Sequence, residues 1–288
     1  MPEPGSVWPP EDWRGQPSIR LRLACGDSVL VALHGAQALS WVASGSESLY
    51  LSPRAMADGR SAIRGGVPVC FPQFNDRGPL PKHGFARHQR WTLLTAQGRV
   101  PEQAGQAARA VFALGDTPAS RALWPHAFQA TLEVLLRPGE LMLTLGVRNT
   151  GAQPLAFTAA LHTYLAVAAV ERAQVTGLDS MAYWDALTGE RRVQHGPVTF
   201  AGELDRVYAA SRAPLHLAQA DGPGLTVAQS AGWGQTVVWN PGAVKGAALA
   251  DMPAGGHAHM VCIEAAQVEA PVPLAPGEGW QAWQRLAA

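Results

Sequence analysis

The sequence AFQATLEVLLRPGELMLTLGVRN, residues 127–149, carries the plainest structural pattern in the chain. Apolar residues recur at every second position on either side of RPGE: Leu132, Val134 and Leu136, then Leu141, Leu143, Leu145 and Val147. A period of two is typical of a strand with one buried face, and RPGE is a turn sequence. The stretch therefore predicts a long antiparallel hairpin.

Similar short strand patterns extend outward from this hairpin in both directions. They begin at SIRLRLA, residues 18–24, and continue to the last residues, with turns rich in glycine between them. TAALHTYLAVAAV, residues 158–170, would also suit a buried helix by composition, and residues 117–124 allow one short helical turn that Pro125 would end. We predict an all-β protein, a large antiparallel β-sandwich, with a surface arm over residues 1–17 and a single domain over residues 18–288.

Composition narrows the class of protein. Hydrophobic residues make up 47% of the 288 residues and charged residues 15%, which indicates an extensive core. The formal net charge of +0 gives no general attraction for nucleic acid or acidic membranes. We see neither an apolar run long enough to span a membrane nor a signal-peptide pattern, so we expect a cytoplasmic protein, and we expect a monomer. The three cysteines, which are odd in number and widely spaced, are expected to be reduced, buried thiols.

An irregular segment, residues 63–91, interrupts the strands. It is rich in glycine and proline, which together shape a rigid loop of the kind that carries binding groups. Arg64 and Arg87 stand near its two ends, and a guanidinium suits bidentate contact with a carboxylate or phosphate. The alternative is that each pairs with an acid such as Asp58 or Asp76. His83, beside a glycine of the loop, is a further candidate.

Two ionisable residues stand inside apolar strand patterns. Glu264 in MVCIEAAQV shares a face with Cys262 and Ala266, and a buried carboxylate there would have a raised pKa and need a partner. His162 lies in TAALHTYLAV. The two could form a general acid–base pair. The alternatives are a solvent-facing glutamate at a strand end and a core histidine bonded to a backbone carbonyl, and spacing alone does not bring the two together.

Other polar residues give weaker signals. His257 and His259 alternate in GHAHM and could ligate a metal from one strand face, but no third ligand is evident. Asp185, at the end of YWD, has a turn-capping aspartate as its ordinary explanation. Neither a Walker loop nor a GxGxxG pattern is present. We therefore predict neither a cofactor nor a metal.

Six segments in combination resemble a known family. They are LSPRAMADGRSAIRGGVPVCFPQF (51–74), GPLPKHGFARHQRW (78–91), ALHTYLAV (160–167), GLDSMAYWD (177–185), VVWNP (237–241) and VCIEAAQV (261–268). The chain is similar to the glucose-6-phosphate 1-epimerases, or hexose-6-phosphate mutarotases, within the aldose 1-epimerase superfamily. The resemblance implies a galactose-mutarotase-like β-sandwich and a metal-free interconversion of α and β anomers.

The resemblance also implies residue roles. His162 would be the general acid that protonates the ring oxygen, and Glu264 the base that takes the proton from the anomeric hydroxyl. Arg64 and Arg87 would hold the 6-phosphate and nearby hydroxyls of a phosphosugar, His83 would bond the sugar, Asp185 would orient a hydroxyl and Gln73 would form part of the pocket wall. Two alternatives stay open: an epimerase for unphosphorylated aldoses, and a non-catalytic carbohydrate-binding sandwich.

Overall fold

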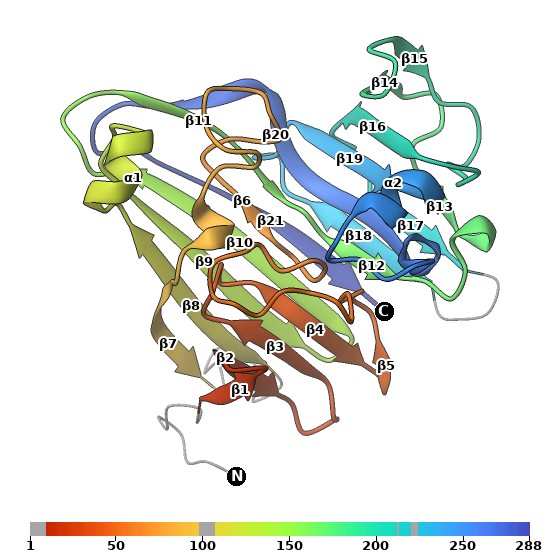
Figure 1. Cartoon of the computed structure of the whole chain (residues 1–288), viewed down its shortest axis with the longest axis horizontal. Coiled ribbons are helices and arrows are strands. Elements are labelled where there is room, and N and C mark those ends of the chain that lie inside the picture. Colours follow the sequence, from red (N-terminus) through yellow and green to blue (C-terminus); the bar gives the residue numbers. More distant parts are fainter. Residues whose placement is uncertain (1–9, 98–106, 212, 220–223) are drawn as a thin grey trace.

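The computed structural model describes residues 10–97, 107–211, 213–219 and 224–288. Their strands form three sheets in which neighbouring strands run antiparallel (Figure 1). The first sheet has the order β1 (Glu11–Trp13), β2 (Gln16–Arg22), β3 (Ser28–Ala32), β4 (Ala38–Ala43), β5 (Ser46–Glu47).

The two larger sheets have eight strands each. The second sheet has the order β13 (Gln174–Thr176), β17 (Leu215–Ala218), β18 (Leu225–Gln229), β21 (Gly279–Ala287), β10 (Glu140–Asn149), β9 (Phe128–Arg137), β8 (Ala108–Gly115), β7 (Thr92–Gln97). The third has the order β15 (Arg191–Val193), β14 (Ala182–Asp185), β16 (Leu204–Ala209), β19 (Gln235–Asn240), β20 (Met260–Leu274), β11 (Leu155–Leu161), β6 (Val69–Cys70), and β12 (Tyr164–Ala166) also pairs with β20. The prediction of a large antiparallel β fold is confirmed.

The hairpin predicted from residues 127–149 is β9 and β10. Their register pairs Leu141 with Leu136 and Leu145 with Leu132, so the alternating leucines of the two strands share one face. These side chains are fully buried. The residues of 158–170, which would also suit a helix, instead form the end of β11, then β12 and the start of the short 3₁₀ helix η3 (Val170–Arg172).

Helices are few and short in the described part of the chain. The predicted helical turn is α1 (Pro118–Leu123), which Thr117 begins by accepting the Ser120 N–H at 3.1 Å. A second helix, α2 (Gly242–Ala248), was not predicted, and it lies on the opposite side of the view from α1 (Figure 1). The remaining 3₁₀ turns are η1 (Ala86–His88) and η4 (Gly256–His259). Among the residues described, none of the helices has the length and hydropathy needed to cross a bilayer.

The core determines which face of the third sheet is free to form a site. One apolar cluster contains residues of all three sheets, and this supports the proposal of a single domain over residues 18–288. In β20, Ile263 and Ala265 point into that cluster. Cys262 and Ala266 point to the other face, as predicted, where a smaller cluster lies. Glu264 shares this second face because side chains alternate along a strand.

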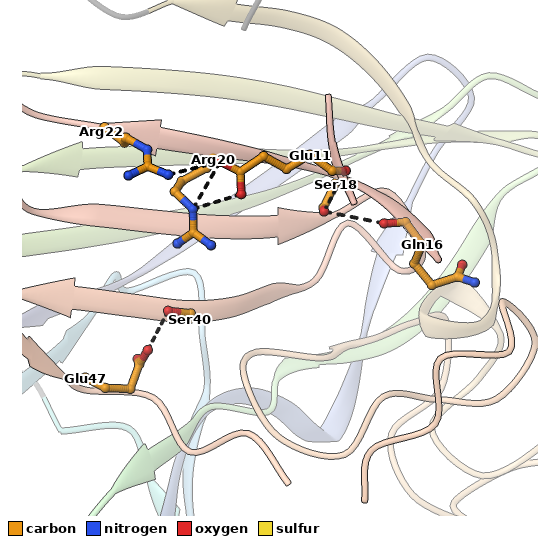
Figure 2. Close-up of polar contacts among 7 residues, drawn as sticks. All are labelled: Glu11, Gln16, Ser18, Arg20, Arg22, Ser40 and Glu47. Atoms are coloured by element: carbon orange, nitrogen blue, oxygen red, sulfur yellow. Dashed lines mark hydrogen bonds and ion pairs between the residues drawn. The ribbon is translucent and has the colours of Figure 1, made fainter. Parts of the chain in front are cut away.

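The predicted N-terminal arm needs correction where the structure describes it. Residues 1–9 of the predicted arm lie outside the described residues, but Glu11–Trp13 pairs with β2, so regular structure begins before Ser18. Glu11 accepts hydrogen bonds from Arg20 at 3.0 Å and from Arg22 at 3.2 Å (Figure 2). The prolines and charges suggested an irregular segment, but an edge strand tolerates both.

Candidate active site

A pocket of about 230 Å³ opens on the free face of the third sheet. Its walls come from the irregular segment 63–91, from the centre of the third sheet and from the α2 region. The residues that line it are Arg64, Phe74, Asn75, Lys82, His83, Arg87, His162, Tyr164, Asp205, Val237, Trp239, Lys245, Leu249 and Glu264. Five of the seven predicted site residues are in this set.

His162 and Glu264 meet at the floor of the pocket. Leu161 pairs with Ala265 and Tyr164 pairs with Cys262, so the register places His162 directly opposite Glu264 on neighbouring strands. His162 Nε2 lies 3.3 Å from Glu264 Oε1, and the two residues are only 7% and 1% exposed. The predicted acid and base are therefore in contact, and neither faces open solvent.

The surroundings of the pair favour its neutral form. Burial raises the pKa of Glu264 well above its usual range, and Asp205 adds to the effect. Burial, followed by the positive charges of Arg87 and Arg64, lowers the pKa of His162 to about 3. Glu264 Oε2 and His162 Nδ1 are buried and have no hydrogen-bond partner among the described residues. Both shifts favour a protonated carboxyl group beside a neutral imidazole.

His83 is held in one tautomer beside this pair. Its Nδ1 accepts the Asn75 N–H at 3.2 Å, so the neutral ring carries its proton on Nε2. Burial and then the neighbouring His162 keep the pKa of His83 far below its usual range. The two rings lie 5.4 Å apart, edge to face. His83 can thus act as a fixed neutral hydrogen-bond donor in the pocket.

Close backbone packing shapes the irregular segment. Gly66 has φ +60°, and a Cβ on it would lie 2.0 Å from the Ala38 carbonyl oxygen. Gly84 has φ +69°, and a Cβ there would lie 2.2 Å from the Phe71 carbonyl oxygen. Glycine is required at both positions, because any side chain would push the segment away from the body of the protein.

The two predicted arginines both line the pocket, but their partners differ. Arg64 donates from Nε to Asp251 at 3.1 Å and from Nη1 to the Tyr164 hydroxyl at 2.9 Å. Its charge is thus already balanced by an acid, as the alternative interpretation held. Arg87 donates to the Lys82 carbonyl at 2.9 Å, has no carboxylate partner among the described residues, and its buried Nε has no partner there either.

Sequence reasoning missed three charged residues of the pocket. Lys82 lies in the irregular segment, 3.6 Å from Asp76, and Lys245 of α2 lies 2.6 Å from Glu203. Asp205 of β16 is the third. Burial raises the pKa of Asp205 to about 6, against the lowering effect of Lys245. Two signals in the sequence could have identified them. Lys245 is a basic residue that follows the VVWNP turn, and Asp205 is an acid inside the strand pattern of LDRVY.

Two predicted residues lie outside the pocket wall. Gln73 instead braces the loop, because its amide group bonds the backbone of Asn75 and Leu80. Asp185 accepts the N–H groups of Leu187 and Thr188, which is the turn-capping role. Register explains its absence from the pocket. Asp185 pairs with Arg206, so Asp185 and Asp205 point to opposite faces of the third sheet.

The structure also bears on metal binding and on the thiols. His257 and His259 lie in η4 rather than on a strand, and His259 Nδ1 contacts the Ala168 carbonyl at 3.0 Å. A different trio, His162, Cys262 and Glu264, has ligand atoms that all lie within 4.8 Å of one another.

All three thiols are free, but Cys25 is exposed, contrary to the prediction that every cysteine is buried. Cys25 occupies a turn, where few apolar neighbours are available.

Sequence comparison with known proteins identifies the family of this chain. The aldose 1-epimerase family model matches residues 17–287. A relative from Cenchrus ciliaris, provisionally named glucose-6-phosphate 1-epimerase, is 35% identical over 280 residues, which are 95% of this chain and 85% of that protein. A relative from Escherichia coli (strain K12) with the same provisional name is 32% identical over 243 residues, which are 82% of this chain and 78% of that protein.

Solved structures agree. A crystal structure of a protein from Salmonella typhimurium, provisionally described as a mutarotase, matches with a TM-score of 0.87 at 27% identity. The match covers 96% of this chain and 92% of that chain. The structure of a galactose mutarotase related enzyme from Lactobacillus acidophilus matches with a TM-score of 0.73 at 14% identity. This match covers 94% of this chain and 96% of that chain. The predicted galactose-mutarotase-like sandwich and the predicted resemblance are confirmed. The chain belongs to the aldose 1-epimerase family.

Proposed function

We propose that this enzyme interconverts the α and β anomers of a hexose 6-phosphate, with glucose 6-phosphate as the first substrate to test. His162 gives a proton to the ring oxygen while Glu264 takes the proton of the anomeric hydroxyl. The ring opens to the aldehyde, the C1–C2 bond rotates, and closure on the other face of the carbonyl reverses both proton transfers. No covalent bond forms between the enzyme and the sugar.

The observation that carries this proposal is the buried contact between His162 and Glu264. The anomeric hydroxyl and the ring oxygen are bonded to the same carbon, so an acid and a base that serve them must lie within a few ångströms of each other. The 3.3 Å separation of Nε2 and Oε1 meets this requirement. Burial raises the pKa of Glu264 and lowers the pKa of His162, which makes proton transfer between the two groups and a hemiacetal possible.

The proton count of the pair is consistent with these roles. The pKa shifts favour a proton on Glu264, whereas the reaction as written needs it on His162. The two forms differ only by transfer across the 3.3 Å contact, so no proton has to enter from solvent. Hydroxyl groups of a bound sugar that donate to Glu264 would favour the ionised carboxylate. Asp205, in the same wall, is placed to accept from another ring hydroxyl.

The distribution of positive charge supports a phosphorylated substrate. Lys82 and Lys245 are 53% and 41% exposed in their side chains, so they lie toward the mouth, whereas the acid–base pair lies at the floor. A C6 phosphoryl group extends away from C1 and would reach this outer zone. We propose Arg87 as the main phosphate ligand because it has no acidic partner among the described residues, with Arg64, Lys82 and Lys245 as further contacts. His83 and Asp205 would bond ring hydroxyls.

We also propose that the protein works in the cytoplasm and as a monomer. Three unpaired cysteines, one of them exposed, suit a reducing compartment. Exposed large apolar side chains such as Leu94, Leu123 and Val244 come from separate elements. Size-exclusion chromatography with light scattering will measure the mass. A dimer at low protein concentration would contradict the second point.

The test of function is the relaxation of freshly dissolved α-glucose 6-phosphate to anomeric equilibrium, measured by polarimetry or exchange NMR. We expect a large acceleration by the wild-type protein and a much smaller one by Glu264→Gln. Asp185→Asn is the matched control, because it also neutralises a carboxylate of the third sheet but lies outside the pocket. Running free glucose beside the phosphate separates the two epimerase hypotheses. No acceleration with either sugar would refute catalysis and leave a carbohydrate-binding role.

A further inference from the structure

A buried cluster of metal-ligand types lies under the pocket. Cys262 and Glu264 are two residues apart on β20 and share a face, and the register places His162 beside them on the neighbouring strand. The candidate ligand atoms of the three residues lie within 4.8 Å of one another. The proposed reaction uses His162 and Glu264 but gives no task to the thiol. The side chain of Cys262 is fully buried.

Two further observations suggest that this cluster can bind a cation. Glu264 Oε2 is a buried carboxylate oxygen that no described residue satisfies. In addition, the two acidic groups of the trio lie together, while Arg64 and Arg87 make no described hydrogen bond to either of them. Buried acids normally have a basic or hydrogen-bonding partner. In the part of the chain that the structure describes, these two acidic groups have only the neutral imidazole of His162 as a partner.

We propose that His162, Cys262 and Glu264 form a binding site for Zn²⁺ or a similar borderline-soft divalent cation, and that occupancy stops the acid–base pair from working. One imidazole, one thiolate and one carboxylate, with the fourth position open to the pocket, form a ligand set of the type that zinc accepts. Mg²⁺ and Ca²⁺ prefer ligand sets made wholly of oxygen and are expected not to bind here. The inhibitory consequence rests on the proposed function, whereas binding does not.

The geometry needs only a small adjustment. Bonds of roughly 2.0 to 2.3 Å in a tetrahedral site put ligand atoms roughly 3.3 to 3.7 Å apart. The imidazole and carboxylate, at 3.3 Å, already fit this spacing. The three ligand atoms lie within 4.8 Å of one another. A shift of the Cys262 sulfur by about 1 Å would therefore bring it to the spacing of a tetrahedral site. On binding, the thiol and the carboxyl group each release a proton to solvent, and the imidazole binds in its neutral form.

The binding test does not depend on catalysis. Wild-type protein is titrated with Co²⁺, which gives a thiolate-to-metal absorption band, and with Zn²⁺ against a chromophoric chelator. We expect one equivalent in each case. Cys262→Ser is expected to abolish the band and to weaken Zn²⁺ binding by about 100-fold or more, because the thiolate is the softest ligand of the trio. Cys25→Ser, which removes the exposed thiol, is the matched control and is expected to bind as wild type does.

The activity test uses the same proteins. We expect Zn²⁺ to inhibit wild type and Cys25→Ser in proportion to occupancy, and EDTA to restore activity. Cys262→Ser should stay active and resist inhibition, since Cys262 is outside the pocket wall; if serine disturbs folding, Cys262→Ala replaces it. Unchanged binding by the Cys262 variants, or loss of binding in Cys25→Ser, would overturn the site. A loaded wild-type enzyme that stays fully active would overturn the inhibitory role. An inactive protein that binds zinc through Cys262 would refute only the proposed function.

Discussion

Replacement of Asp205 by asparagine should stabilise the protein at neutral and alkaline pH while it lowers activity. Asp205 lies in the pocket wall, and burial raises its pKa to about 6, with Lys245 lowering it and Glu203 raising it. A carboxylate in this setting is ionised at neutral pH at a cost to the folded state. Asparagine keeps nearly the same shape and carries no charge, so it removes that cost. It also replaces the charged acceptor proposed for a sugar hydroxyl with a weaker, neutral one.

The magnitude follows from the displacement of the pKa from 3.8 to about 6. Each pKa unit corresponds to about 1.4 kcal/mol, so ionised Asp205 lowers the free energy of unfolding by at most about 3 kcal/mol. The sign is set by proton binding. Between pH 3.8 and about 6 the folded state holds a proton that the unfolded chain has released, so stability falls as pH rises through this window. Below it both states are protonated, and the cost disappears.

The assay is urea unfolding of wild type and Asp205→Asn at about pH 4, near the lower edge of this window, and at about pH 8, above it. We expect a gain of about 2 to 3 kcal/mol at the higher pH and almost none at the lower pH. Asp185→Asn serves as control, because it makes the same chemical change outside the pocket and keeps an oxygen that can accept the turn N–H groups, so it should give no gain. A variant that is no more stable than wild type at about pH 8, or whose gain persists at about pH 4, would refute the reasoning.

The other predictions concern catalysis, substrate choice and the loop. Glu264→Gln should lower kcat by about 10²- to 10⁴-fold, the range for loss of one acid–base group, and a fully active variant would exclude it as the base. Arg87→Met should lower kcat/KM for the phosphosugar by about 10- to 100-fold, with little effect on free glucose. Arg64→Met should have a smaller effect, because Arg64 already has an acidic partner. Equal loss with both sugars would count against phosphate binding. Gly66→Ala should cost at least about 3 kcal/mol in urea unfolding, whereas Gly45→Ala, with φ +81° and open space, should cost about 1 to 2 kcal/mol. Similar losses for the two variants would refute the packing argument.

Local pattern was enough to predict what depends on neighbours in sequence. The alternation in residues 127–149 gave the β9–β10 hairpin because its two strands are joined by a short turn. The alternation around Glu264 likewise gave the face of β20 on which this carboxylate lies. Loop composition indicated the pocket wall, because glycine permits positive φ and proline fixes φ wherever they occur.

What the sequence did not reveal depends on pairing between distant segments. Asp205 enters the pocket because β16 pairs with β19 and β19 with β20, and neither pairing leaves a local trace. Asp185 was predicted in its place, yet a one-residue difference in register with β16 puts it on the other face. Lys245 reaches the pocket from α2, a helix too short to have a recognisable apolar period.

The contact between His162 and Glu264 depends on a break in a strand. Residues 162 and 163 interrupt the run from β11 to β12, yet the register on β20 is the same on both sides of the break. Gln284, buried on β21 of the second sheet, explains how the break is held. Its side chain accepts from the Thr163 hydroxyl at 2.5 Å and donates to the Ile263 carbonyl at 2.9 Å. One amide that crosses the sandwich thus fixes the residue next to each member of the pair, so the hydrophobic core and the acid–base geometry are set by the same packing.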